Sequence, residues 1–496
     1  MRIILSFITL LVCFHAIGQT STPKREFRAA WIATIGNIDW PSKQGLNSEI
    51  QKAEFKSLLA QCKKNGLNAV IVQIRPSADA LYASPYENWS RYLSGKQGQP
   101  PSPYYDPLTF MVEECHKECI EFHAWFNPYR ALVDATKNPN TKDHITWQHP
   151  EWFVNYGGKK YFDPGLPEVR EYFTNVVLDV VKRYDIDAVH FDDYFYPYRI
   201  AKVEFPDAKS FAKYKGSFTN KDDWRRNNVN ILIEDLGKKI KQTKSYVKFG
   251  ISPFGVWRNY SKDIEGSRTN GGQTNYDDLY ADIIMWMKKG WIDYMLPQLY
   301  WEIGHRAADY TELLRWWSEH TFGRSLYIGH GLYQVGVSTK ACWKNMNEIE
   351  TQVTNLRKVP NVSGSAYYSA NAFKKNLCGL NYSMQDNINP RPALLPTMSW
   401  IDNVSPQAPF LKISTGNEGS VQLYWSVENP TKEELQFAVY KFAPGEKMDV
   451  SSSTNLVAIV RGNNFSDKPT GKINYNYVVT ALDRLHNESM MSNVVK

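Results

Sequence analysis

The sequence predicts an α/β protein in which a (β/α)8 TIM barrel is followed by a small all-β sandwich. Three observations support this prediction. The chain has 496 residues, enough for one large barrel and one small domain. Up to about residue 390, apolar strand-like segments alternate with amphipathic helical patterns. Beyond that point the helical periodicity stops, and only short segments with alternating apolar residues follow.

Eight apolar segments are the expected barrel strands. In chain order they are 27–34, 68–75, 120–126, 186–192, 247–252, 292–299, 326–329 and 365–369. Helical patterns fall between them, at 49–65, 108–118, 169–183, 224–241, 279–289, 310–319 and 345–357. We therefore expect the barrel to occupy residues 25–390.

The N-terminus is typical of a secretory signal peptide. Arg2 precedes an apolar run at 3–14, and small residues at Ala16 and Gly18 suit cleavage after residue 18. This run is too short for a stable membrane span, and no later stretch approaches 18 apolar residues. We expect residues 1–18 to direct export to the periplasm or the cell exterior, without stable membrane insertion of the mature chain.

The C-terminal region begins with a proline-containing passage. We expect residues 391–404 to be a linker and residues 405–496 to be a β-sandwich. The segment Tyr475–Asp483, with Trp425 upstream, resembles the second half of a fibronectin type III domain. That resemblance implies a spacer or docking role.

Aromatic residues make up 14% of the chain, with 16 Trp and 30 Tyr, more than core packing requires. Aromatic faces stack on both sugar rings and nucleobases. The formal net charge is only +7, and short lysine groups such as 238–244 suit the wet face of a helix. Nucleic-acid binding requires a clustered basic stripe, so a glycan is the favoured partner. We expect the protein to be a monomer.

Carboxylates cluster where two strands of the predicted barrel end. Asp192 and Asp193 follow the fourth strand, and Glu302 follows the sixth. Glycoside hydrolysis requires two carboxyl groups, one as acid and one as nucleophile or base, and the predicted pair is Asp192 and Glu302. Side chains alternate along a strand, so if the strand continues, only one of Asp192 and Asp193 enters the site.

Other polar and aromatic residues at strand ends suit the recognition of sugar hydroxyls, and each could instead be a capping or core residue. His190 lies in the middle of a strand, which favours a structural role. The candidate substrate-binding residues are Trp31, Gln73, Arg75, Asn127, Tyr129, Arg130, Asp193, Tyr194, Trp257, Gln298, Tyr300 and Trp301.

Seven motifs in order carry a family resemblance: FRAAWIATIGNIDWP, NAVIVQIRPSADALY, HAWFNPYR, YFDPGLPEVR, DAVHFDDYFYP, GISPFGVWRN and MLPQLYW. Together they resemble the bacterial glycoside hydrolase-like 10 family over residues 25–390. The resemblance implies an exported enzyme that cleaves denuded peptidoglycan glycan strands. It also implies that Asp192 is the family's acidic residue after strand four, whereas Glu302 rests on its position alone.

Two alternatives remain open. The protein could be a non-catalytic carbohydrate-binding or scaffold protein of the cell envelope, because only one carboxylate is firmly assigned. A metal-dependent barrel hydrolase is less favoured, since its site usually needs a His-x-His pair on an early strand and segment 27–34 has no histidine. We therefore expect neither a metal nor a cofactor.

Overall fold

The computed structural model describes residues 22–135, 140–416, 420–428, 434–468 and 474–496. The expected signal peptide at 1–18 lies outside these residues. Within them, no helix is both long enough and apolar enough to cross a bilayer.

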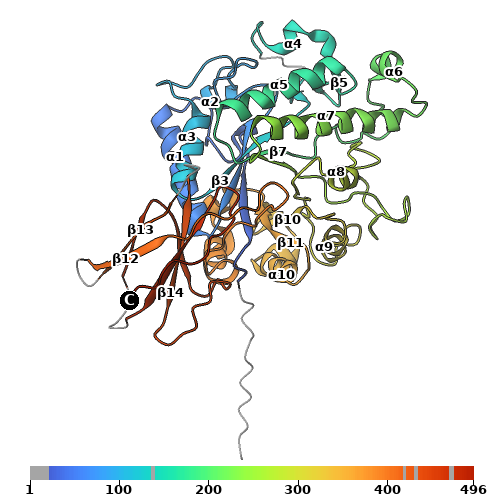
Figure 1. The fold of residues 1–496 in the computed structure, drawn as a ribbon. Helices are drawn as coiled ribbons and strands as arrows, with labels where there is room; N and C mark the ends of the chain where they lie inside the picture. Colours follow the sequence, from blue (N-terminus) through green and yellow to red (C-terminus); the bar gives the residue numbers. More distant parts are fainter. Residues whose placement is uncertain (1–21, 136–139, 417–419, 429–433, 469–473) are drawn as a thin grey trace, which may run out of the picture.

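Eight parallel strands close into a barrel in the order β1-β11-β10-β9-β8-β7-β3-β2 (Figure 1). All eight predicted segments contribute, so the predicted barrel is confirmed. The strands are β1 (Phe27–Ile32), β2 (Ala69–Arg75), β3 (Glu121–Phe126), β7 (Ala188–Phe191), β8 (Lys248–Ile251), β9 (Tyr294–Met295), β10 (Ser325–His330) and β11 (Val362–Tyr367). β9 is shorter than the expected segment 292–299, which contains Pro297, a residue without a backbone N–H for strand pairing.

Helices surround the barrel (Figure 1). Seven match the predicted helical patterns: α1 (Ser48–Lys64), α3 (Pro107–Lys117), α5 (Pro167–Arg183), α7 (Lys221–Thr243), α8 (Ile283–Lys289), α9 (Tyr310–Ser318) and α10 (Asn347–Leu356). Side-chain caps begin several of them. Asn47 accepts a hydrogen bond from Glu49 N before α1, and Asp106 accepts one from Leu108 N at the start of α3.

The connections between strands carry short elements. After β3 a small antiparallel sheet has the order β4-β6-β5. Its strands are short, which explains why the sequence pattern did not predict them. The short elements are η1 (Ile35–Asn37), α2 (Arg91–Ser94), β4 (Arg130–Leu132), α4 (Ile145–Gln148), η2 (Pro150–Trp152), β5 (Phe153–Tyr156), β6 (Lys159–Phe162), α6 (Ala208–Tyr214), η3 (Leu332–Gln334), η4 (Ala341–Trp343), α11 (Asn371–Lys375), η5 (Leu377–Gly379), α12 (Leu380–Tyr382) and η6 (Ser383–Ile388).

The C-terminal region forms a small β-sandwich, as predicted. Its two antiparallel sheets have the orders β12-β13-β16 and β15-β14-β17. Leu423, Trp425 and Phe437 are buried in the core between the sheets. The strands are β12 (Phe410–Thr415), β13 (Val421–Ser426), β14 (Gln436–Phe442), β15 (Leu456–Arg461), β16 (Asn464–Asp467) and β17 (Asn476–Leu482).

The sandwich docks on the N-terminal ends of the barrel strands. His486 Nε2 lies 2.8 Å from Glu121 Oε1 at the start of β3, and Arg484 Nη2 donates to Asp187 Oδ1 over 3.0 Å, just before β7. Segment 391–404, expected as a linker, packs here as well: Leu394 exchanges backbone hydrogen bonds with Lys24 and Glu26. The opposite end of the barrel is therefore left for a functional site.

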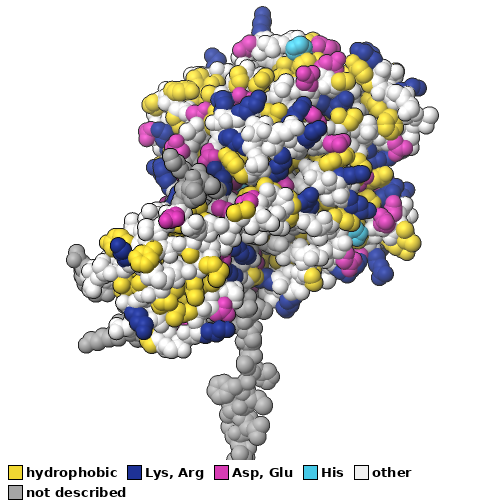
Figure 2. All heavy atoms as spheres, in the orientation of Figure 1, with side chains coloured by type: hydrophobic (Ala, Val, Ile, Leu, Met, Phe, Trp, Pro, Cys, Tyr) yellow, Lys and Arg dark blue, Asp and Glu magenta, His cyan; other side chains and the backbone are white. Residues whose placement is uncertain are grey.

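Charged side chains are mixed over the face drawn in Figure 2. Lys and Arg side chains lie among Asp and Glu side chains across the barrel, without gathering into a basic stripe on this face. This distribution does not provide the electrostatic footprint of a nucleic-acid-binding surface.

Candidate active site

A pocket of about 260 Å³ lies at the C-terminal ends of the barrel strands. In TIM barrels this is the end that carries the active site. Residues from β1 and β3 and from the segments after β7, β9, β10 and β11 form its wall. They are Trp31, Trp125, Asp192, Asp193, Tyr194, Tyr198, Gln298, Tyr300, Tyr333 and Tyr368.

Both carboxylates after strand four line this pocket. β7 ends at Phe191, so the alternation of a strand does not extend to Asp192 and Asp193. The expectation that only one of them enters the site depended on a continuing strand. The turn after Phe191 instead brings two buried carboxyl groups to one cavity.

Asp192 is held by Asn127. The Asn127 Nδ2 donates to both carboxylate oxygens, over 3.2 and 3.1 Å. Burial raises the pKa of Asp192 above its ordinary value, while the nearby cation of Arg130 and the Asn127 amide oppose that rise. Asp192 therefore has partners that stabilise its ionised form.

Asp193 has a more strongly raised pKa. Burial is the largest cause, and the negative charge of Asp192 adds to it, so the pKa rises to about 7. The hydroxyl of Tyr198 donates to one oxygen, and Gln298 Nε2 lies 3.3 Å from the other. Near neutral pH, Asp193 can therefore hold a proton beside an ionised Asp192.

Aromatic rings form one side of the pocket. The Tyr300 ring stacks on the Tyr368 ring, with 5.9 Å between the ring centres, and packs edge-on against the Tyr333 ring at 6.0 Å. The ring centres of Trp31 and Tyr300 are 6.5 Å apart. Gly331 permits this packing, because a Cβ there would lie 3.1 Å from Tyr300 Cβ. The wall offers flat apolar faces for the C–H faces of sugar rings.

A buried ion pair between Arg75 and Glu87 holds the backbone at Asn127. Arg75 Nε and Nη2 donate to Glu87 over 2.8 and 2.5 Å, and Arg75 Nη1 donates to the carbonyl of Asn127. Arg75 thus positions the end of β3 and does not line the pocket.

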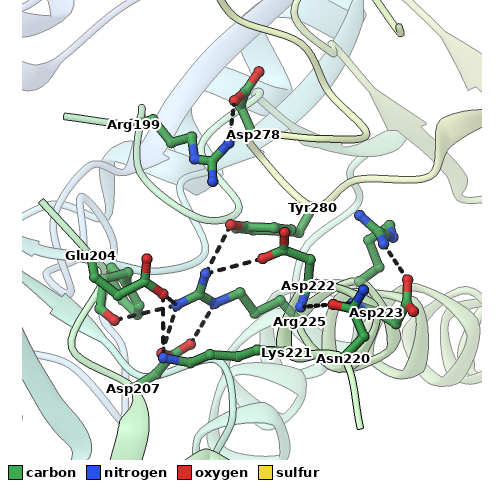
Figure 3. Close-up of polar contacts among 12 residues, drawn as sticks. Arg199, Glu204, Asp207, Asn220, Lys221, Asp222, Asp223, Arg225, Asp278 and Tyr280 are labelled. Carbon is green, nitrogen blue, oxygen red and sulfur yellow. Dashed lines mark hydrogen bonds and ion pairs between the residues drawn. The ribbon is translucent and has the colours of Figure 1, made fainter. Parts of the chain in front are cut away.

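The loop that carries Asp193, Tyr194 and Tyr198 is anchored at its far end by Arg225 of α7 (Figure 3). The buried Arg225 guanidinium pairs with Asp207 and donates to the Tyr280 hydroxyl over 2.8 Å. In the same view Arg199 pairs with Asp278 of the loop after β8, at 3.1 Å. These contacts fix the far end and the middle of the loop.

The structure brings together part of the predicted site. Asn127 contacts Asp192, and Arg130 places its guanidinium 5.3 Å from the Tyr194 ring centre. Gln73 accepts backbone hydrogen bonds from the turn after β1. The predicted residues that line the pocket are Trp31, Asp192, Asp193, Tyr194, Gln298 and Tyr300, and those outside its lining are Gln73, Arg75, Asn127, Tyr129, Arg130, Trp257, Trp301 and Glu302.

The predicted partner of Asp192 lies elsewhere. Lys340 Nζ is 2.7 Å from Glu302 Oε1 and 2.9 Å from Oε2, which lowers the pKa of Glu302 against the opposing effect of burial. The chain after β9 is not a regular strand, so Glu302 does not follow Gln298 and Tyr300 into the pocket. The structure therefore does not place Glu302 in the pocket that Asp192 lines.

Other predicted aromatic residues pack in the body of the barrel. Trp257 stacks on Trp316 at 5.6 Å, Trp301 contacts Phe254, and Tyr129 is buried. His190 is fully buried, in agreement with the structural role expected for it.

His190 lies inside the barrel between Trp31 and Tyr294, 3.4 Å from the Trp31 indole nitrogen.

Sequence reasoning missed four residues of the pocket wall: Trp125, Tyr198, Tyr333 and Tyr368. Tyr198 lies in the aromatic run after strand four and could have been found there. Tyr333 lies in a 3-10 turn, where no periodicity indicates direction. Within the described residues, no group of three or more His, Cys, Asp or Glu side chains is arranged to hold a metal ion.

The chain is similar to several known proteins. A family model described as "Glycosyl hydrolase-like 10" matches residues 26–345. "Glycosyl hydrolase YngK" of Bacillus subtilis is 45% identical over 99% of this chain and 96% of its own length. "Glycosyl hydrolase DigH" of Escherichia coli K12 is 36% identical over 72% of this chain and 86% of its own. The PgaB (BpsB) glycoside hydrolase domain of Bordetella bronchiseptica superposes with a TM-score of 0.49 and 11% identity, over 73% of this chain and 99% of its own.

Proposed function

The chain belongs to the glycosyl hydrolase-like 10 family, and from this premise we propose that it is an exported glycoside hydrolase of peptidoglycan glycan strands or a related polysaccharide. The observation that carries the proposal is the rim pocket, where two buried carboxyl groups lie against an aromatic wall. The expected signal peptide supports export.

We assign the acid role to Asp193 and the charge-stabilising role to Asp192. Cleavage of a glycosidic bond needs a proton for the leaving oxygen and a negative charge near the oxocarbenium-like transition state, and it is completed by a water whose oxygen bonds to the anomeric carbon and whose proton returns to the acid. Asp193 retains a proton near neutral pH because burial and the charge of Asp192 raise its pKa to about 7. Asn127 and Arg130 favour the ionised form of Asp192, which can stabilise the positive charge on the sugar.

The aromatic wall supports a sugar substrate. Tyr300, Tyr333 and Tyr368 present ring faces and hydroxyls together, which suits a ligand with apolar C–H faces and polar edges. No basic stripe is needed for such a ligand, in agreement with the mixed charges of Figure 2.

A non-catalytic carbohydrate-binding protein of the cell envelope is the alternative. The two proposals share the pocket and differ in whether Asp193 transfers a proton. Incubation of the purified protein with glycan strands freed of peptides separates them, with released products identified by mass spectrometry.

We expect new reducing ends with the wild type and with the control Asp386→Asn. Asp386 is an exposed carboxylate outside the pocket lining. We expect a loss of about 10²- to 10⁴-fold with Asp193→Asn, the contribution usual for a positioned general acid. Binding of strands without any cleavage by the folded wild type would favour the alternative.

A further inference from the structure

Five buried side chains form a hydrogen-bonded column through the inside of the barrel. The column runs from the N-terminal ends of the strands to the rim pocket, and its members in order are Glu121, His123, Tyr294, His190 and Trp31. The atoms that join successive members lie 2.9, 2.8, 2.9 and 3.4 Å apart. Trp31, the last member, lines the pocket.

The barrel makes room for this column. The interior of a TIM barrel is filled mainly by branched aliphatic side chains, and a polar group there costs stability unless it is hydrogen-bonded. Gly250 of β8 faces the Tyr294 ring, and a Cβ at this glycine would lie 1.9 Å from Tyr294 Cζ. Gly329 of β10 faces the Trp31 indole, and a Cβ there would lie 3.0 Å from Trp31 Cη2. Two strands therefore lack a side chain where rings of the column pass.

The groups at the two ends set the direction of the hydrogen bonds. An indole N–H only donates, so His190 Nε2 accepts from Trp31. At the other end, although burial opposes it, the cation of Lys248 holds the pKa of Glu121 well below its ordinary value, so this carboxyl is ionised. An ionised carboxylate only accepts, and His123 Nε2 therefore donates to Glu121.

The groups between these ends then have one consistent arrangement. Burial, with His123 nearby, holds the pKa of His190 well below its ordinary value, so this imidazole is neutral and carries its proton on Nδ1. His190 Nδ1 donates to the Tyr294 oxygen, and the Tyr294 hydroxyl donates to His123 Nδ1. All the hydrogen bonds of the column therefore point from Trp31 toward Glu121.

We propose that Tyr294 and His190 are positioning residues for Trp31, because they fix the acceptor that orients the Trp31 indole in the rim pocket. The indole packs edge-on against the Tyr368 ring, with 6.1 Å between the ring centres. A fixed indole keeps the aromatic wall ordered before a ligand binds, which reduces the entropy lost on binding. The inference goes beyond the proposed function, and only its kinetic consequence rests on that function.

Nuclear magnetic resonance of the full chain tests the column without a substrate. The chain has 16 Trp residues, and in protein labelled with ¹⁵N-tryptophan the Trp31 indole signal is identified by its loss in Trp31→Phe. Tyr294→Phe keeps the ring but removes the acceptor for His190 Nδ1–H. We expect His190 to shift toward the tautomer with its proton on Nε2. The Trp31 indole proton should then exchange with solvent about fivefold faster, the factor usual for one lost hydrogen bond.

Three further variants sharpen this measurement. The matched control is Tyr327→Phe, at a buried tyrosine outside the column whose ring centre lies 5.3 Å from that of Tyr294, and it should change neither signal. His190→Gln can supply an amide oxygen to the Trp31 indole and should keep its slow exchange, whereas His190→Leu should lose it. Glu121→Gln keeps an acceptor at its end of the column and should leave the Trp31 signal of the folded protein unchanged.

Kinetics on glycan strands separate positioning from a purely structural role. Tyr294→Phe should raise KM about fivefold and leave kcat within about twofold, because it disturbs the binding wall and leaves both carboxyls in place. In the double variant Trp31→Phe/Tyr294→Phe, KM should equal that of Trp31→Phe alone, since the column then has no indole to orient.

A wild-type His190 with its proton on Nε2, an unchanged Trp31 signal in Tyr294→Phe, or additive KM effects in the double variant would overturn the inference. The tautomer of His190 is measured in the wild type, so it decides the matter even if Tyr294→Phe does not fold. Failure of the proposed function is distinguishable, because a wild type that cleaves no glycan overturns that function and leaves the resonance measurements to decide the column.

Discussion

Buried carboxyl groups occur at both ends of the barrel, and their partners differ. At the C-terminal rim, Asp192 and Asp193 receive hydrogen bonds from amide and hydroxyl donors, and neither forms a salt bridge within the part of the chain that the structure describes. At the N-terminal end, Glu121 contacts Lys248, and His486 approaches it from the sandwich.

This difference in partners reverses the direction of the pKa shifts. Burial alone would raise the pKa at either end. At Glu121 the cation of Lys248 and hydrogen bonds from His123 and His486 outweigh burial, and the pKa lies well below its ordinary value. At Asp193 burial dominates and the pKa rises to about 7. The N-terminal end thus uses its charges for docking and stability, whereas at the rim the raised pKa of Asp193 allows the proton that the proposed function requires.

The largest expected effect is at the rim. Asp192→Asn removes the charge that we propose stabilises the transition state, so kcat/KM on glycan strands should fall about 10²- to 10⁴-fold. The free energy of unfolding should not decrease, because an amide avoids the cost of a buried charge. Steady-state kinetics and urea unfolding measure the two quantities, with Asp386→Asn as control.

If Asp192→Asn instead lowered the free energy of unfolding and left kcat/KM unchanged, Asp192 would have a structural role, like Glu121 at the opposite end of the barrel.

The next effect is at Glu121. Glu121→Gln leaves Lys248 buried without its counter-charge, which should lower the free energy of unfolding by about 3–5 kcal/mol. Cleavage by the folded fraction should change little. Urea unfolding checks this against Glu113→Gln, an exposed carboxylate on α3.

Acid should act in the same direction as Glu121→Gln. A lowered folded-state pKa contributes stability that is present above the unfolded pKa and is lost as pH falls below it. The pKa values of Glu121, Asp187 and Glu26 are all lowered, against burial, by nearby cations. Stability should therefore decline below about pH 4. Stability that instead rose on acidification would exclude the ion-pair account of this end.

A smaller effect is expected at the edge of the sandwich contact. Arg484 pairs with Asp185 and Asp187 but is partly exposed, so Arg484→Met should cost about 1–2 kcal/mol of unfolding free energy. Thermal unfolding should show a loss of stability that the control Lys412→Met does not show. Lys412 is an exposed residue of β12. An identical loss in both variants would mean that the contact does not stabilise the assembly.

The smallest effect is expected at Glu302. Its ion pair with the half-exposed Lys340 is worth about 0–1 kcal/mol, and Glu302→Gln should change kcat/KM by less than about threefold. The same kinetic assay measures it. A loss as large as that of Asp193→Asn would restore Glu302 to the catalytic pair predicted from its position.

The sequence predicted the features that lie within or directly after a periodic strand or helix pattern. Strand and helix periodicity predicted the eight barrel strands, and polar residues after strand four indicated Asp192 and Asp193. The pattern stopped at strand ends. It could not show that the chain turns after Phe191, so that both carboxylates line the pocket, or that the segment after Met295 leaves Glu302 outside the pocket lining.

Contacts between residues far apart in the chain were also beyond the sequence. Lys340 lies 38 positions from Glu302, and His486 lies 365 positions from Glu121. Tyr333 and Tyr368 reach the pocket from irregular segments, where no periodicity gives the direction of a side chain. The predicted strand ends therefore located the pocket, while its wall and its ion pairs required the fold.

The pH dependence of kcat/KM on glycan strands tests the central claim most directly. If protonated Asp193 is the acid, kcat/KM should fall about tenfold per pH unit above an apparent pKa of about 7, because the raised pKa marks where the proton is lost. The residual activity of Asp193→Asn should not show this alkaline decline. A profile that stays level well above pH 7 in the wild type, or an unchanged decline in Asp193→Asn, would contradict the account.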